Sequence, residues 1–335
     1  MPPKKSSSTP ASTPEQASTL AFDQIYHMDC LEGFRQLATN SADIVICDPP
    51  YPVNNYSDKK ILDDYLKWAD QYIAEAFRVV KEDGTVFIFG YSELLSFVRT
   101  RLPIPLNNCR WLIWHFTNKN IPTLRFWQRS HESILCCWKK GDRPNFNLDD
   151  VREPYTELFM KGAAGRKRVA TKGRFSDGTK ETVYNAHEKG ALPRDTFKIP
   201  AIAGQAFQKE RVVFPTQRPL ELCKRLILSA RRELPAETVV VVPFAGSGSE
   251  CVAAYQLGAK FIGFEIDEAA IGVAAQRLLY ADAPDPSPNT SPTGSVASKT
   301  LFETRSRPSS GSSSGSASSG APKNLIIDPN QDYNE

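Results

Sequence analysis

The sequence has no CxxC pair, no long apolar run and almost no net charge, and each absence excludes a class of protein. Its 7 cysteines are odd in number and most have apolar neighbours, which argues against disulfides and bound zinc and favours a reducing compartment. No stretch approaches the roughly 18 apolar residues that cross a bilayer, and the N-terminus lacks a secretion signal. The net charge of +3 does not by itself indicate a polyanionic partner. We therefore expect a cytoplasmic protein with no membrane partner and no metal site.

The two ends of the sequence differ in composition from the region between them. Residues 1–19 and 282–335 are rich in Ser, Pro, Thr and Gly, and such segments bury too little apolar area to offset the entropy lost on ordering. We expect both to be disordered tails. Between them, short β-branched runs alternate with helical patterns, which predicts an α/β fold with a mostly parallel sheet and crossover helices. The expected strands are 42–47, 85–89, 111–116, 133–138, 238–242 and 260–265, and the expected helices are 63–80, 219–230, 249–257 and 268–280.

The segment 141–210 loses this periodicity and carries the basic excess of the chain. Residues 151–198 hold 11 basic and 6 acidic side chains, a net charge of +5. A run of cations in this segment could follow a phosphate backbone, and a solvated insertion explains the charge equally well. The run comprises Arg166, Lys167, Arg168, Lys172 and Arg174. Arg125 and Arg129 flank Phe126 and Trp127, which is a second candidate contact for nucleic acid.

The turn after the expected strand 238–242 has the composition of a nucleotide-binding turn. Small residues in such a turn let the backbone approach a ligand. Cys251 stands where a dinucleotide fingerprint has its third glycine, which argues against NAD and FAD. Glu265 ends the next strand about twenty residues on, where a carboxylate can accept hydrogen bonds from both ribose hydroxyls. The candidate cofactor residues of the turn are Phe244, Ala245, Gly246, Ser247 and Gly248.

Asp48, Pro49, Pro50 and Tyr51 directly follow the expected strand 42–47. An acid at the carboxyl end of a parallel strand lies where ligands bind in open α/β sheets. The prolines make the turn rigid and leave carbonyl acceptors, so these residues suit the binding of an amino group beneath an aromatic ring. Acceptors on both hydrogens of an exocyclic base amine would localise its lone pair, while Tyr51 stacks on the flipped base. We interpret the four residues as catalytic; a plain Asp-Pro turn is the alternative.

These motifs, in this order, resemble those of the amino-group DNA methyltransferases. Asp-Pro-Pro-Tyr precedes Pro-Phe-Ala-Gly-Ser-Gly with a basic segment between them, which is similar to the beta group, a circular permutation with the catalytic half first. Residues 27–32 resemble the family's GDCLE element, residues 131–140 its HEyil...K strand, and residues 214–219 its HPTQKP element. The resemblance extends over residues 25–279.

The resemblance implies a Rossmann-like methyltransferase fold with helices on both faces of the sheet. It implies a catalytic half at 20–140, a target-recognition insertion at 141–210 and a cofactor-binding half at 211–281. The cofactor would be S-adenosylmethionine. Asp29 would contact its adenine, and Thr216 and Gln217 would line the pocket for its methionine. The glycine turn and Glu265 would complete the cofactor site.

The implied activity is site-specific methylation of duplex DNA, by direct transfer to the N6 amino group of a flipped adenine. Adenine is preferred to the N4 of cytosine because cytosine enzymes usually carry Ser at the position of Asp48. A methyltransferase acting on RNA or protein is another hypothesis, as is a DNA-binding homologue without catalysis. Val242 motivates the latter because the family usually has Asp there, while Phe214 and Met28 replace the usual His and Gly. The resemblance leaves open a homodimer and a cognate restriction endonuclease as partners.

Overall fold

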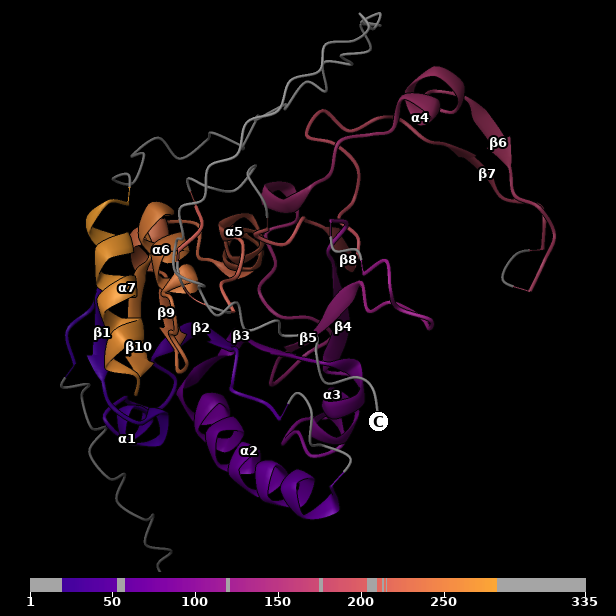
Figure 1. The fold of residues 1–335 in the computed structure, drawn as a ribbon. Helices are drawn as coiled ribbons and strands as arrows, with labels where there is room; N and C mark the ends of the chain where they lie inside the picture. Colours follow the sequence, from indigo (N-terminus) through magenta and orange to yellow (C-terminus); the bar gives the residue numbers. More distant parts are fainter. Residues whose placement is uncertain are drawn as a thin grey trace, which may run out of the picture. The chain divides into compact units, whose positions relative to one another are not determined.

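The apolar runs of the sequence form one eight-stranded sheet with the order β1-β10-β9-β2-β3-β5-β4-β8 (Figure 1). The computed structural model describes residues 20–52, 58–118, 121–174, 177–203, 210–212, 214 and 216–281. All of these residues belong to a single compact unit. The two predicted tails, 1–19 and 282–335, lie outside the described residues. Along the described chain, no helix is long and apolar enough to cross a membrane.

The strands are built from buried β-branched and aromatic residues. They are β1 Gln24–His27, β2 Ala42–Cys47, β3 Val80–Gly90, β4 Cys109–His115, β5 His131–Cys137, β8 Thr196–Lys198, β9 Val239–Val242 and β10 Lys260–Glu265. The six strands predicted from the sequence are confirmed, although β3 begins at Val80 rather than at residue 85. Pairing is parallel except around β5, which runs antiparallel to β3 and β4. The predicted mostly parallel sheet is therefore confirmed.

Helices cover both faces of the sheet. One face is covered by α1 Cys30–Arg35, α2 Lys59–Val79 and α3 Ser92–Arg99, and the other by α5 Leu220–Ala230, α6 Ser249–Gln256 and α7 Glu268–Leu279. Alternate residues of β2 point to opposite faces of the sheet: Val45 packs with α1 and α2, and Ile44 packs with α5 and α6. Helix α2 begins before residue 63 because the Asp58 carboxylate caps it, accepting hydrogen bonds from Lys60 N and Ile61 N.

The strand order reverses between β2 and β9. From β2 the chain crosses through α2 to β3, whereas from β9 it crosses through α6 to β10 on the opposite side. The two strands meet in register, with Ile44 beside Val240 and Val45 beside Val241. A reversal of this kind opens a crevice at the carboxyl ends of the strands, where open α/β sheets bind their ligands.

Two short edge strands are not predicted by the sequence. At one edge β1 pairs with β10, and at the other β8, from the basic segment 141–210, pairs in parallel with β4. Both strands are short and partly exposed, so neither has a clear apolar run. The rest of that segment includes α4 Glu157–Gly162 and a separate ribbon of β6 Lys167–Val169 and β7 Glu181–Val183. The basic segment is therefore joined to the main sheet through β8.

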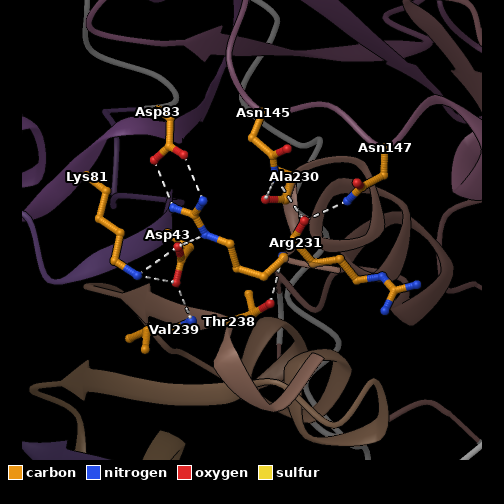
Figure 2. A network of polar contacts seen from close by, with 10 residues as sticks. Asp43, Lys81, Asp83, Asn145, Asn147, Ala230, Arg231, Thr238 and Val239 are labelled. Carbon is orange, nitrogen blue, oxygen red and sulfur yellow. Dashed lines mark hydrogen bonds and ion pairs between the residues drawn. The ribbon is translucent and has the colours of Figure 1, made fainter. Parts of the chain in front are cut away.

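Opposite charges meet at the amino end of β2 (Figure 2). Asp43 is 1% exposed, and its carboxylate accepts hydrogen bonds from Lys81 Nζ at 2.9 Å, from Val239 N at 2.9 Å and from Arg232 Nε. Arg232 also forms a two-pronged pair with Asp83, at 2.7 and 2.8 Å. We call Asp43, Lys81, Asp83 and Arg232 the amino-end cluster. Its two acids and two cations balance in charge.

Two asparagines hold the start of the basic segment against the carboxyl end of α5 (Figure 2). The side-chain amide of Asn145 donates to Ala230 O and to Arg231 O, the latter at 2.9 Å. The amide of Asn147 donates to Arg231 O at 2.6 Å. The last carbonyl groups of a helix have no partner within the helix, so these amides satisfy groups that would otherwise need water.

Candidate active site

Asp48 and the glycine turn lie beside each other at the carboxyl edge of the sheet. Asp48 follows the last residue of β2, and Pro243 follows the last residue of β9. Continuing the pairing of Val45 with Val241 along the two strands sets Asp48 level with Phe244. Glu265 ends the neighbouring strand β10 at the same edge. Residues that the sequence assigns to catalysis and to cofactor binding are thus adjacent in the fold.

A buried arginine binds the Asp48 carboxylate. Nε and Nη2 of Arg218 donate to its two oxygens at 2.7 and 2.8 Å, and Nη1 donates to Glu132 Oε2 at 2.5 Å. The hydroxyl of Tyr51 donates to the same Glu132 oxygen at 3.2 Å. We call Asp48, Tyr51, Glu132 and Arg218 the carboxyl-end cluster. Burial alone would lower the pKa of Arg218, but the carboxylates of Asp48 and Glu132 raise it well above its usual value, so the guanidinium stays charged.

Aromatic rings hold both the arginine and the tyrosine of this cluster. Arg218 is 6% exposed, and its Cζ lies 5.1 Å from the ring centroid of Phe89 and 5.4 Å from that of Trp114. The Tyr51 ring meets Tyr91 edge-on, with centroids 5.2 Å apart. Burial raises the pKa of Tyr51, so its hydroxyl remains protonated. The tyrosine therefore acts as a neutral donor and an apolar surface.

The turn after β9 requires glycine at two positions. Gly246 and Gly248 have φ values of +48° and +76°, and a Cβ on Gly248 would lie 2.8 Å from the Cβ of Ala274. Glu265 Oε2 accepts a hydrogen bond from Gly246 N at 2.7 Å, which sets the carboxylate against the turn. A close-packed turn with an adjoining carboxylate fits a nucleoside cofactor, because the acid can accept from ribose hydroxyls while the backbone approaches the ligand. Phe244 itself packs on Trp68 of α2, with ring centroids 5.6 Å apart.

The remaining predicted cofactor residues lie in separate loops. Asp29 is exposed and caps α1, where its side chain accepts from Leu31 N at 2.9 Å. The side chain of Gln217 bonds within its own loop, accepting from Val212 N and donating to Glu210 O. Thr216 is exposed. Ala245 and Ser247 are buried within the glycine turn. Cofactor contacts by these residues stay predictions.

The predicted DNA contacts differ in their surroundings. Arg125 is exposed, and the aromatic pair that follows it is exposed as well, Phe126 at 80% and Trp127 at 87%. Arg129 instead forms a two-pronged pair with Glu93, at 2.8 and 3.2 Å, and its Cζ lies 4.2 Å from the ring centroid of Tyr91. In the basic segment all the predicted cations are exposed, on or near the β6–β7 ribbon: Arg166, Lys167, Arg168, Lys172 and Arg174.

Three charged residues of the site receive no role from the sequence. Arg218 and Glu132 each lie in a recognised element, but they are 86 residues apart, and no spacing rule shows that they meet. Glu250 is 4% exposed in the first turn of α6, and burial, followed by the charge of Asp48, raises its pKa to about 7. An acid directly before the apolar run Cys251–Ala254 is the signal that could have identified it.

Comparison with known families decides what kind of protein this is. The DNA methylase model for N6 and N4 enzymes matches residues 42–276, a range that contains both charged clusters. The chain belongs to the N6/N4 DNA methyltransferase family. Because its Asp-Pro-Pro-Tyr motif precedes its glycine turn, this methyltransferase is of the beta group, and the resemblance seen in the sequence is confirmed. S-adenosylmethionine is the methyl donor of the family.

Two curated relatives align with most of the methyltransferase. The type II methyltransferase M.HpaI of Haemophilus parainfluenzae is 27% identical over 75% of this chain and 72% of its own length. The DNA adenine methyltransferase YhdJ of Escherichia coli (strain K12) is 27% identical over 76% of this chain and 82% of its own length. Among solved structures, the PvuII DNA methyltransferase, described as cytosine-N4-specific, matches with a TM-score of 0.53 at 15% identity, over 78% of this chain and 88% of that one. The last similarity demonstrates the common fold.

Proposed function

We propose that this methyltransferase modifies the N6 amino group of adenine in duplex DNA after the base has been flipped out of the helix. One observation carries the proposal: Asp48 and the glycine turn directly follow the paired strands β2 and β9, where the order of the sheet reverses. A methyl donor bound along the turn and an amine held by Asp48 would meet at the boundary between β2 and β9. The Asp48 side chain is only 16% exposed, so a base stacked within a duplex could not reach it without flipping.

Asp48 and Pro49 supply acceptors for the two amino hydrogens of the base. Each Asp48 oxygen accepts one hydrogen bond from Arg218, which leaves further lone pairs for a substrate. Bonds from the amine to Asp48 and to the Pro49 carbonyl favour the form in which the nitrogen lone pair is localised. S-adenosylmethionine supplies an activated methyl group. As positive charge develops on the nitrogen, the Asp48 carboxylate stabilises it, and Tyr51 stacks on the base.

Substitution of Asp48 tests this assignment directly. We expect Asp48→Ala to lower methyl transfer to duplex DNA by about 10³-fold or more, because it removes both an acceptor and the compensating charge. Binding of S-adenosylmethionine, measured by calorimetry, should stay within about threefold of the wild type. Asp64→Ala is the matched control, since Asp64 is 60% exposed on α2. Near wild-type turnover by Asp48→Ala would overturn the assignment. Cofactor binding by the wild type without transfer to DNA, RNA or protein would instead support the non-catalytic homologue.

The preference for adenine rests on Asp48, where cytosine enzymes usually carry Ser, and is supported by the name of the relative YhdJ, a DNA adenine methyltransferase. Digestion of the methylated DNA to nucleosides, followed by mass spectrometry, measures the product. We expect N6-methyladenine. N4-methylcytosine as the sole product would establish the alternative base and leave the role of Asp48 intact.

The exposed cations of the β6–β7 ribbon are the proposed phosphate contacts of the recognition segment. Replacing Arg166 and Arg168 with Ala should lower the slope of log Kd against log salt by about 2, because each lost phosphate contact lowers it by roughly 1. Lys67→Ala on α2, 73% exposed, should leave the slope unchanged. An unchanged slope for the double variant would mean that the ribbon does not follow the phosphates. A homodimer and a partner restriction endonuclease belong to the same proposal, the latter supported by the type II relative M.HpaI.

A further inference from the structure

Arg218 binds Asp48 in a geometry that no other cation can reproduce. Its Nε and Nη2 donate to different oxygens of one carboxylate, so the two planar groups meet edge to edge in a fixed fork. A lysine has a single ammonium group. It could bond to both oxygens, but it would not fix the plane of the carboxylate. The third nitrogen, Nη1, is directed to Glu132, which fixes the rotation of the guanidinium. The plane and direction of the Asp48 carboxylate are therefore set by Arg218.

The arginine is itself immobilised by the core. Cζ of Arg218 lies near the rings of Phe89 and Trp114, residues of β3 and β4 that are 1% and 3% exposed. Glu132, the second partner, is 8% exposed in β5. Three neighbouring strands thus hold the guanidinium, and through it a side chain at the end of a fourth, β2. A fixed acceptor costs no reorganisation when charge develops on its partner.

The charge of the carboxyl-end cluster also suits an amine substrate. One guanidinium lies between two carboxylates, which leaves a surplus of one negative charge at the edge of the sheet. Full neutralisation of the two acids would weaken their attraction for a nitrogen that becomes positive. A cation that is shared between two carboxylates leaves net negative charge for the substrate.

We propose that Arg218 is a positioning residue of the methyl transfer, which aligns the Asp48 carboxylate that accepts the target amine, and that Glu132 fixes Arg218 in that role. This inference rests on the proposed function of Asp48. It assigns a role in catalysis to an arginine of residues 214–219, a segment of the predicted cofactor-binding half.

Kinetics of Arg218 variants separate positioning from folding and from cofactor binding. We expect single-turnover rates on duplex DNA to fall by about 10-fold to 100-fold in Arg218→Lys and by about 10²-fold to 10³-fold in Arg218→Met, with KM for S-adenosylmethionine within about threefold of the wild type. Glu132→Gln keeps an acceptor for Arg218 Nη1 and should lose only about 5-fold to 10-fold.

Guanidinium rescue keeps the test decisive if the methionine variant folds poorly. Arg218→Ala should regain at least 10-fold in rate when guanidinium chloride is added at low millimolar concentration, whereas sodium chloride at equal ionic strength gives no gain and methylammonium gives less. Wild-type rates for Arg218→Met, or equal rescue by guanidinium and methylammonium, would overturn the proposal and leave the function of Asp48 standing. If instead the wild type transfers no methyl group to any substrate, the proposed function fails and this inference falls with it.

Discussion

The two ends of strand β2 each carry an aspartate paired with an arginine, and the two pairs are built for different tasks. Both arginines flank α5: Arg218 precedes its first turn and Arg232 follows its last. At the amino end, Asp43 and Asp83 face Lys81 and Arg232, so charges balance and every oxygen of Asp43 has a protein donor. At the carboxyl end one arginine serves two acids.

The difference in charge balance distinguishes the amino-end cluster, which is structural, from the carboxyl-end cluster, which is suited to a reaction. The hydrogen bonds from Arg232 lower the pKa of Asp83, so this acid favours its ionised form. Near Asp48 the opposite holds, since burial and then the charge of Asp48 raise the pKa of Glu250 to about 7. A balanced buried cluster joins chain segments, whereas a cluster with surplus negative charge holds carboxylates that repel one another and attract a cationic partner. Variants at the two ends should therefore affect stability in opposite directions.

The largest effect is expected from Asp43→Asn. Loss of this carboxylate leaves Lys81 and Arg232 facing each other around a buried amide, which should lower the free energy of unfolding by about 3–4 kcal/mol. Urea denaturation of the purified protein measures the loss, with the exposed Asp64→Asn as the control. The folded variant should methylate DNA at the wild-type rate. A change below about 1 kcal/mol would show that the amino-end cluster is not a structural joint.

Glu250→Gln should have the next largest effect, and it should depend on pH. The pKa of Glu250 is raised in the folded protein from 4.5 to about 7, so the wild type binds this proton more tightly when folded and loses stability as the pH rises between these values. Glutamine cannot ionise. Between pH 5 and pH 8, the free energy of unfolding of the variant should rise relative to that of the wild type, by about 2–3 kcal/mol at pH 8. Denaturation curves across that range measure the difference, and a constant difference would contradict the raised pKa.

Asp48→Asn should change the stability in the opposite direction from Asp43→Asn, and by a smaller amount. Removing one of two carboxylates leaves Arg218 paired with Glu132 and cancels the surplus charge, so stability should be unchanged or higher by about 1 kcal/mol. Thermal and urea unfolding would measure this while methyl transfer is lost. Destabilisation equal to that of Asp43→Asn would abolish the distinction between the two ends.

The smallest effect is expected from Lys81→Met. Its side chain is 32% exposed, and Arg232 still pairs with Asp43 when the ammonium is removed. We expect a loss below about 1 kcal/mol in the free energy of unfolding, because the lysine is partly exposed to screening solvent and Asp43 keeps its other donors. The same urea series measures it. A loss as large as that of Asp43→Asn would mean that Lys81, rather than Arg232, neutralises the buried acid.

Local patterns predict much of this structure, and long-range pairing accounts for what they miss. The buried run of β2 and the apolar stripe of α2 are visible in the sequence, since each repeats within a few residues. The edge strand β8 is not, because three residues, of which only Phe197 is buried, form a strand only where β4 offers its free edge. Likewise Asp48 is recognisable from its prolines, whereas its partner Arg218, 170 residues away, depends on the sheet bringing both to one edge.

The basic segment is a case where charge predicts exposure but not arrangement. Its exposed cations agree with the composition, yet the anchoring of its start by Asn145 and Asn147 follows from the position of the α5 carboxyl end. An asparagine has no distinctive spacing that marks it as a helix cap from another part of the chain. The boundaries of the recognition segment accordingly stay predictions.

The pairing of β2 with β9 also determines when the protein can fold during its synthesis. Asp43 and Val239, which bond at the amino end of these strands, are separated by 196 residues. A ribosome must translate all of them before β2 can pair with β9, and closing so large a loop is entropically costly and slow. While the nascent chain waits, the side chains of Asp43 and Asp48 have neither arginine to bind. Methylation activity can therefore arise only after β9 has been translated.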